Sequence, residues 1–490
     1  MVYILVRRYL GSIPRLAIGV RLPDIVIPPV LKAFKARDAV GTLMLSYHRE
    51  TAPSDVIASG EFILLGHSGT SITEYITKAT KYAEDYGAII EVEADHVSLM
   101  ASPERAIKRI TVGVFEYGLS ESEIRESLNY IEREFKEVNE AGGVDFVTID
   151  TCELIDLGIN KLGSSDVLAA YEERFDSDFR KKLEEKYINR TFKFISNNGK
   201  IYVIKFSKED IARLALKYYK SIEYVKVVYD TIRKYLDDRE FGVEIALDEV
   251  PEVTNPKEVF FFLSELKRIG IDPDFIAPNV GFKKREDYDG DLRVLEETIR
   301  KLHAITSSLG VLLSFHSGSG AHPYSDKGLG TWGVVRRATN GLLKYKVSGV
   351  YIQLLLEVMS KFPPMSEPRR LYEEIFDAVL EYLKKDIKHK KGLYSPQLER
   401  LVKRYEEAVK KVPQKRRDPR TDFFRHYFFI FQAVMDANRR RYLREKVIDL
   451  YSKHKELQGI YEKEAAELTL RIIDKLGLKG NYIKYKSIRL

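Results

Sequence analysis

Histidine and carboxylate side chains recur directly after short apolar segments of this chain. Four segments show the pattern: Glu91–His96, Phe146–Glu153, Glu244–Glu249 and Ser314–Ser319. Imidazole and carboxylate groups together are suitable ligands for Mn, Fe, Co, Ni or Zn. Because an unpaired carboxylate is costly to bury, acids that converge inside a fold need a cation, a proton or a substrate. The pattern therefore indicates a metal-dependent or acid–base site.

Side chains alternate between the two faces of a strand, so the polar members of each segment share one face. These polar-face residues are Thr148 and Asp150, Glu244 and Asp248, and Ser314 and His316. A single acid at a strand end is more often a helix cap or a loop ion pair than a ligand. His96 and His316 are the stronger metal candidates, since each directly follows an apolar strand.

Candidate strands alternate with amphipathic helical patterns such as Ser120–Glu140 and Pro256–Ile269. The candidate strands are Thr42–Tyr47, Phe62–Leu65, Ala88–Val92, Phe146–Ile149, Ile201–Phe206, Val243–Leu247, Phe275–Ala277 and Val311–Phe315. This alternation is typical of a mainly parallel sheet, and both a doubly wound sheet and a (β/α)8 barrel fit it. We favour an α/β fold of the TIM-barrel type, because polar residues follow many different strands, as a barrel active site requires.

The predicted organisation has three parts. Residues 1–85 form an N-terminal α/β portion that contributes to the barrel. Residues 86–360 form the main barrel with the active site, and residues 361–490 form a helical C-terminal extension, because the pattern becomes helical there.

Composition excludes several classes of protein. The apolar fraction of 44% among 490 residues excludes whole-chain disorder, and a single cysteine, Cys152, excludes an intrachain disulfide. No apolar run reaches the roughly 18 residues that a membrane helix needs, and we see no secretory signal. We therefore expect a cytoplasmic location. The many Lys, Arg, Glu and Ile residues suggest a heat-adapted source.

Positive charge is concentrated in one segment. Residues 381–420 contain 14 Lys/Arg and 6 Asp/Glu, a net charge of +8 in a chain whose total is +7. A nucleic-acid partner is one interpretation. We favour a solvated helical face or a contact between copies in a homo-oligomer.

The ordered set of motifs resembles the tagaturonate epimerase family, which contains metal-dependent epimerases acting at C4 of a ketose uronate. The matching motifs are Glu93–His96, Thr148–Asp150, Glu244–Glu249, Ala277–Pro278, Asp287–Asp291 and His316–Ser319. The resemblance is densest from residue 88 to residue 360 and extends to Asp422–His426 and Tyr442–Arg444. It implies an isomerase with a divalent transition metal (Zn, Ni, Co, Mn or Fe). The implied substrate is tagaturonate, fructuronate or the related ketohexose.

The chain departs from the family pattern in three places. The loop after Pro278, residues Asn279–Arg285, is shorter and lacks the family's usual Lys and Arg. The family's His-Ser-Gly-Ser-Asp-Lys run is interrupted here by six extra residues, Gly320–Ser325, before Asp326 and Lys327. Further on, Lys344 stands where the family commonly has histidine.

The reaction implied by the resemblance limits the mechanism. The C4 hydrogen of a 2-ketose is not α to the carbonyl, so its direct removal is disfavoured. Transient oxidation by NAD is disfavoured too, because Gly328–Gly333 does not directly follow a strand as a dinucleotide fingerprint does. The remaining route is retro-aldol cleavage of C3–C4 followed by reclosure. That route needs a Lewis acid and a base.

The residues that we assign to these roles are His96, Asp150, Glu244 and His316 as metal ligands; Asp95, Asp248 and Glu153 as acid–base groups; and Ser317, Gly318, Ser319, Lys327 and Lys346 as substrate-binding groups. Two alternatives remain open. One is a metal-dependent sugar isomerase or aldolase on the same barrel. The other is a non-catalytic protein that binds a sugar acid or nucleic acid.

Overall fold

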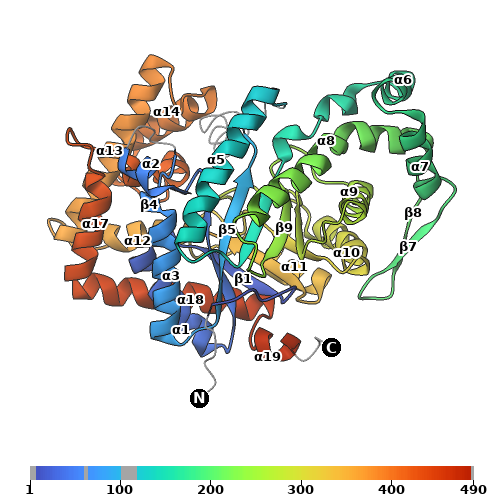
Figure 1. Cartoon of the computed structure of the whole chain (residues 1–490). Coiled ribbons are helices and arrows are strands. Elements are labelled where there is room, and N and C mark those ends of the chain that lie inside the picture. Colours follow the sequence, from blue (N-terminus) through green and yellow to red (C-terminus); the bar gives the residue numbers. More distant parts are fainter. Residues whose placement is uncertain (1–6, 60–64, 101–117, 487–490) are drawn as a thin grey trace.

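The computed structural model describes residues 7–59, 65–100 and 118–486, and within them a closed parallel barrel is the central feature (Figure 1). The order around the barrel is β1-β12-β11-β10-β9-β6-β5-β2, so strands that follow each other in the chain pair with each other. The strands are β1 (Arg15–Gly19), β2 (Gly41–Ser46), β5 (Ile90–Ser98), β6 (Phe146–Asp150), β9 (Gly242–Leu247), β10 (Phe275–Pro278), β11 (Leu312–Phe315) and β12 (Leu343–Val347). The predicted (β/α)8 barrel is confirmed.

Each barrel strand is followed by a helix that packs outside the barrel (Figure 1). These helices are α1 (Pro23–Ala36), α3 (Ile72–Tyr86), α5 (Glu121–Glu140), α8 (Lys208–Arg233), α9 (Pro256–Arg268), α10 (Leu292–Ser308), α11 (Thr331–Thr339) and α12 (Val350–Ser360). Local chemistry sets several of their ends. Ser120 and Glu123 form a capping box on α5, and Asn255 caps α9 ahead of a proline in the first turn.

Two insertions interrupt the barrel pattern. After β2 come β3 (Thr51–Ala52), α2 (Ser54–Ser59) and β4 (Thr70–Ser71). After β6 come the 3-10 helices η1 (Cys152–Leu154) and η2 (Leu157–Lys161), the helices α6 (Ser164–Arg174) and α7 (Ser177–Tyr187), and an antiparallel hairpin of β7 (Phe192–Ile195) and β8 (Ile201–Ile204). The second insertion lies to one side of the barrel, opposite the C-terminal helices (Figure 1).

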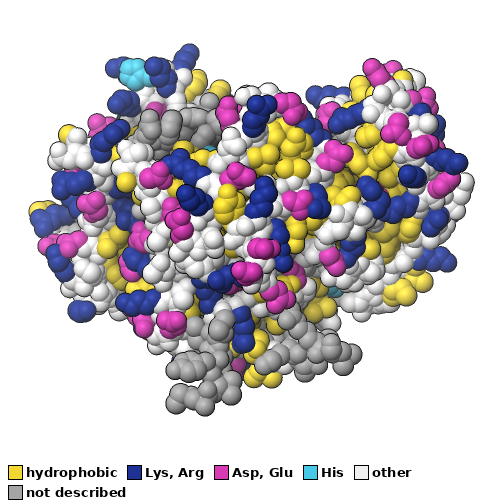
Figure 2. Space-filling view, viewed as in Figure 1, with side chains coloured by type: hydrophobic (Ala, Val, Ile, Leu, Met, Phe, Trp, Pro, Cys, Tyr) yellow, Lys and Arg dark blue, Asp and Glu magenta, His cyan; other side chains and the backbone are white. Residues whose placement is uncertain are grey.

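The predicted helical C-terminal region is confirmed. It contains α13 (Glu367–His389), α14 (Pro396–Lys411), η3 (Pro413–Lys415), α15 (Asp422–Tyr427), α16 (Ile430–Ala433), α17 (Tyr442–Lys453), α18 (Lys455–Leu476) and α19 (Asn481–Lys486). Helix α18 packs on α1, α11 and α12, which joins this region to the barrel. Lysine and arginine side chains gather at the outer end of α13 and α14 (Figure 2). None of the described helices is long and apolar enough to cross a membrane.

Several strand predictions need correction. Ile201–Phe206 contains a strand, but it belongs to the β7–β8 hairpin and not to the barrel. Of Phe62–Leu65, residues 62–64 lie outside the described part of the chain. Strands β1 and β12 were not predicted. Strand β12 reads Leu-Lys-Tyr-Lys-Val, and its two lysines conceal a fully buried strand, because their side chains point into the barrel and not to solvent.

The barrel interior contains charged pairs where other barrels have aliphatic layers. Near the N-terminal ends of the strands, Arg15 donates to Glu91 at 2.7 Å, and neither side chain has any exposed surface. The Arg15 guanidinium lies 5.0 Å from the ring centre of Phe146 and 4.8 Å from that of Phe275. This pair and its two rings fill the lower part of the barrel.

We predict that Arg15→Met lowers the free energy of unfolding by about 3–5 kcal/mol, because it leaves the Glu91 carboxylate buried without its partner. Urea unfolding measures the loss. The double variant R15M/E91Q removes both charges and should regain most of the stability. A single variant as stable as the parent chain would contradict the prediction.

Candidate active site

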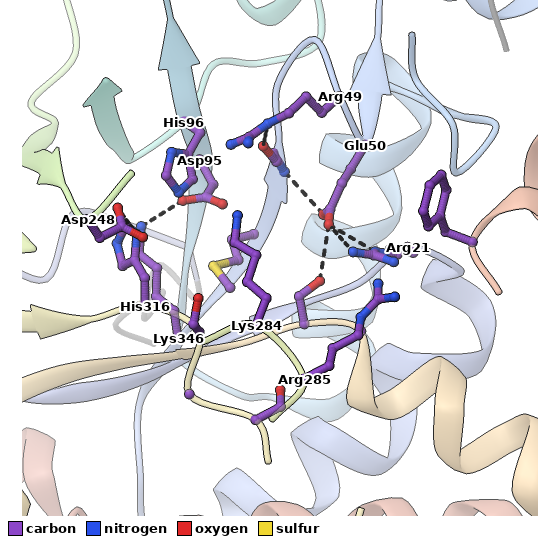
Figure 3. A pocket seen from close by; sticks show the side chains of 18 of the residues that line it. Arg21, Arg49, Glu50, Asp95, His96, Asp248, Lys284, Arg285, His316 and Lys346 are labelled. Carbon is purple, nitrogen blue, oxygen red and sulfur yellow. Dashed lines mark hydrogen bonds and ion pairs between the residues drawn. The ribbon is translucent and has the colours of Figure 1, made fainter. Parts of the chain in front are cut away.

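One cavity lies at the C-terminal ends of the barrel strands and has two ends of opposite character (Figure 3). The acidic end consists of Asp95, His96, Asp248 and His316. The basic end consists of Arg21, Arg49, Lys284 and Arg285, together with Glu50. His426 and Phe429, from the C-terminal region, also line the cavity.

An irregularity in β5 brings two consecutive residues to the acidic end. In a regular strand Asp95 and His96 would point to opposite faces. The pairing of β5 with β6 shifts register between Ala94 and Val97, and His96 has a φ of 49°. This bulge re-aims the side chains, so that the carboxylate and the imidazole both line the cavity.

The two imidazoles predicted to meet do so. The ring centres of His96 and His316 are 4.9 Å apart. His96 Nδ1 lies 3.1 Å from Asp150 Oδ2, and His316 Nε2 lies 2.5 Å from Glu244 Oε1. His316 Nδ1 also lies 2.9 Å from Asp248 Oδ1, so both nitrogens of that ring face carboxylates.

Two groups of side chains in the described residues could hold a metal ion, and His96 belongs to both. The first adds Asp248 and His316, and the second adds Asp150 and Glu249. All members of the first group line the cavity. In the second, Glu249 already pairs with Arg49 at 2.8 Å and with Lys284 at 3.1 Å. The geometry therefore favours the first group.

Two buried lysines from β12 lie behind the acidic end. Lys346 Nζ is 2.7 Å from both Glu93 and Asp95 and 2.9 Å from Glu244. Lys344 Nζ is 2.8 Å from Glu93 and 3.1 Å from Glu244. These lysines neutralise part of the negative charge that the strands bring together.

The same lysines shift the protonation of their neighbours. Burial opposes ionisation of Asp95, but Lys346 and the two histidines outweigh burial, so the pKa of Asp95 is lowered. The pKa of Glu244 is also lowered against burial, by Lys344 and Lys346. Burial lowers the pKa of His316, but Asp248 and Glu244 outweigh burial and raise it to about 9.

The predicted ligands Asp150 and Glu244 are not equivalent to the histidines they accompany. Glu244 belongs to neither metal-binding group, and Asp150 belongs only to the less favoured one. Both contact an imidazole nitrogen directly. In metal sites such a carboxylate commonly orients a histidine ligand from behind.

The predicted acid–base and substrate groups fall into two sets. Asp95, Asp248, Lys346 and Ser317–Ser319 all line the cavity. Glu153 is buried in η1 and does not line the cavity. Lys327 is fully buried, and its ammonium donates to the carbonyls of Lys283, Glu286 and Ser319 at 2.6, 2.7 and 3.1 Å. Its donors are thus used to hold loops together.

Close packing around the segment Ser317–Ser319 explains why its central residue, Gly318, is a glycine. A Cβ on Gly318 would lie 2.4 Å from the Tyr345 ring and 2.6 Å from the carbonyl oxygen of Lys346. The backbone amide of Gly318 donates to that same carbonyl at 3.1 Å. The segment is therefore packed tightly against β12.

Sequence reasoning missed the whole basic end. Arg49 and Glu50 follow the predicted strand Thr42–Tyr47, so the rule that found the acidic residues could also have found these two. Arg21 follows β1, a strand that was not predicted. Lys284 and Arg285 lie in the loop after β10, where sequence spacing alone gives no direction.

Comparisons with known proteins agree with the resemblance found in the sequence. The tagaturonate epimerase family profile matches residues 101–469, well over half of the chain. The tagaturonate/fructuronate epimerase of Thermotoga maritima is 28% identical over 284 residues, which cover 57% of this chain and 54% of that protein. The chain thus matches about half the length of that curated relative.

Solved structures show the same fold. The native crystal structure of fructuronate-tagaturonate epimerase from Cohnella laeviribosi has a TM-score of 0.66 at 20% identity, covering 96% of this chain and 83% of that one. A glycerol complex of that protein also has a TM-score of 0.66. With the profile match over most of its length, the chain belongs to the tagaturonate epimerase family.

Proposed function

We propose that this chain is a metal-dependent epimerase that inverts C4 of a ketose uronate and interconverts tagaturonate and fructuronate. The observation that carries the proposal is the meeting of His96 and His316 with Asp95 and Asp248 in one cavity at the C-terminal end of the barrel. Membership of the tagaturonate epimerase family supports it.

The charges of the acidic end fit a divalent cation. Five carboxylates, from Glu93, Asp95, Asp150, Glu244 and Asp248, and two ammonium groups, from Lys344 and Lys346, sum to a formal charge of −3. Protonation of His316, whose pKa is raised to about 9, reduces this to −2. His316 Nδ1 and Asp248 Oδ1 are both buried and lie 2.9 Å apart, so two potential ligand atoms stand side by side. Neighbouring imidazole and carboxylate ligand atoms beside uncompensated negative charge suit a divalent transition metal.

We assign His96, Asp248 and His316 as the protein ligands, with Asp150 and Glu244 holding the imidazoles in orientation. A divalent transition metal at this position would supply Lewis acidity to the oxygens of the sugar.

Asp95 is the group that we assign to proton transfer. Its carboxylate accepts from Lys346 at 2.7 Å and lines the cavity beside the two histidines. In the proposed reaction Asp95 takes the proton of the C4 hydroxyl, and the C3–C4 bond breaks. The electron pair of that bond passes to the ketose fragment, which becomes an enediolate, and C4 becomes an aldehyde. Rotation of the aldehyde, bond formation on its other face and return of the proton to O4 complete the inversion.

Lys346 and the Ser317–Ser319 segment position these groups. Lys346 fixes the Asp95 carboxylate, so its role in this proposal is positioning. The backbone of Ser317–Ser319 forms a polar wall of the cavity against which sugar hydroxyls can be oriented.

We predict that the purified protein converts tagaturonate into fructuronate and the reverse. NMR analysis of the products checks this, because a C4 epimerase leaves the carbonyl at C2. A product with a moved carbonyl would favour the isomerase alternative, and accumulation of two three-carbon fragments would favour the aldolase.

We predict that His96→Ala removes a bound divalent metal, because His96 belongs to both candidate groups. Elemental analysis measures the metal content of each chain. If the first group is the site, Asp248→Asn loses metal and Glu249→Gln retains it. His67→Ala is a matched control, since His67 is a buried histidine of the same cavity that belongs to neither group. Normal metal content in H96A would contradict the assignment.

We predict that Asp95→Asn lowers kcat by about 100-fold or more without loss of bound metal. Steady-state kinetics and elemental analysis of the same preparation check both parts. Wild-type kcat in this variant would remove Asp95 from the proton-transfer step.

A further inference from the structure

The basic end of the cavity carries more positive charge than its own acids neutralise. Arg21, Arg49, Lys284 and Arg285 contribute four cations. Glu50 pairs with Arg21, and Glu249 pairs with Arg49 and Lys284. Two acids against four cations leave a formal excess of +2 at this end. Buried or partly buried cations in excess favour an anionic ligand.

Arg21 has a donor that no group in the described part of the chain accepts. Its Nε donates to Glu50 Oε1 at 2.9 Å, and its Nη2 shares that oxygen. Its Nη1 is buried and has no hydrogen-bond partner among the described residues. The residue is only 7% exposed and lines the cavity. A buried guanidinium nitrogen without an acceptor is costly, so a ligand oxygen is expected there.

Arg285 is a second guanidinium in the wall of the cavity. Its Nη1 donates to the backbone oxygens of Arg425 and His426, both at 2.6 Å, and its guanidinium lies 4.6 Å from the ring centre of Phe428. These contacts fix the group in one orientation. Its Nε and Nη2 face Gly349, where a Cβ would lie only 3.3 and 3.2 Å from them. The missing side chain at Gly349 leaves room for this guanidinium in the cavity wall.

The pKa shifts of Arg285 and His67 agree with an excess of positive charge at the basic end. Burial, followed by repulsion from Arg21, lowers the pKa of Arg285 to about 9 despite the opposing effect of Glu50. Burial and then the charges of four arginines, Arg21 first and Arg285 next, lower the pKa of His67 far below its usual value. His67 is thus neutral and adds no charge of its own.

We propose that Arg21 and Arg285 bind the carboxylate of the sugar acid at the basic end of the cavity, which makes them the residues that select an acid over a neutral ketose. This inference rests on the proposed function. It sets the orientation of the substrate: C6 lies among the guanidinium groups, and the C2–C4 portion lies at the acidic end beside Asp95 and His316. Figure 3 shows Arg21 and Arg285 on the side of the cavity opposite Asp248 and His316, with Lys284 between them.

Calorimetric titration with galacturonate and with galactose tests the carboxylate site separately from turnover. Wild-type protein, as purified, should bind galacturonate about 10- to 100-fold more tightly than galactose, as expected for charge-assisted hydrogen bonds. The double variant R21Q/E50Q removes the guanidinium together with its partner. It should lose most of this preference while its affinity for galactose stays the same.

Three further variants make the result specific. E50Q alone should bind galacturonate at least as tightly as wild type, because it frees Arg21 donors. R21K keeps the charge but loses the planar donor pair. Its preference for galacturonate over galactose should therefore lie between those of wild type and R21Q/E50Q. R293Q removes an exposed arginine outside the cavity and should change nothing. Thermal melting identifies any variant that fails to fold, in which case R21K carries the test.

An unchanged preference for galacturonate in R21Q/E50Q or R21K, or no preference in wild type, would overturn the inference. Failure of the proposed function would give a different set of results from failure of this inference. In that case tagaturonate is not epimerised by wild type, while the loss of galacturonate binding in the arginine variants still occurs.

Discussion

Charges buried inside a barrel must neutralise one another, because the protein interior returns little of the solvation they lose. This constraint organises the chain along the barrel axis. The Arg15–Glu91 pair fills the lower part, and Lys344 and Lys346 neutralise two of the five carboxylates above it. Compensation is incomplete at the C-terminal ends of the strands. The remaining negative charge therefore lies where a cation and a substrate can reach it.

As a result of this arrangement, one end of the cavity is acidic and the other is basic. Its acidic end is carried by β5 and by the residues after β9 and β11, and its basic end by the residues after β1, β2 and β10. Anchoring both ends at barrel strands keeps their separation fixed, which suits a ligand with an anionic group at one end and reacting carbons at the other. The C-terminal helical region adds His426 and Phe429 to the wall and holds Arg285 through backbone oxygens.

The same constraint explains where prediction of the fold succeeded and failed. Strands with apolar outer faces, such as Phe146–Asp150 and Gly242–Leu247, were recognisable because their helix-facing residues are apolar. Strand β12 was hidden, since lysines that neutralise interior acids look like surface residues in the sequence. Strand β1 has the short pattern Arg-Leu-Ala-Ile-Gly, in which the buried Arg15 has the same effect.

The sequence by itself determined the barrel class and the neighbourhood of Asp95, His96, Asp248 and His316, because parallel strands in a barrel bring their C-terminal ends to one face. Only the tertiary structure decided the roles within that neighbourhood. Strand register and loop packing set three features of the site. These are the bulge at His96, the placement of Glu244 and Asp150 behind the imidazoles, and the burial of Lys327 under three carbonyls. Residue spacing does not encode these features. The basic end was decided in the same way, because its arginines come from loops whose direction is set by what they pack against.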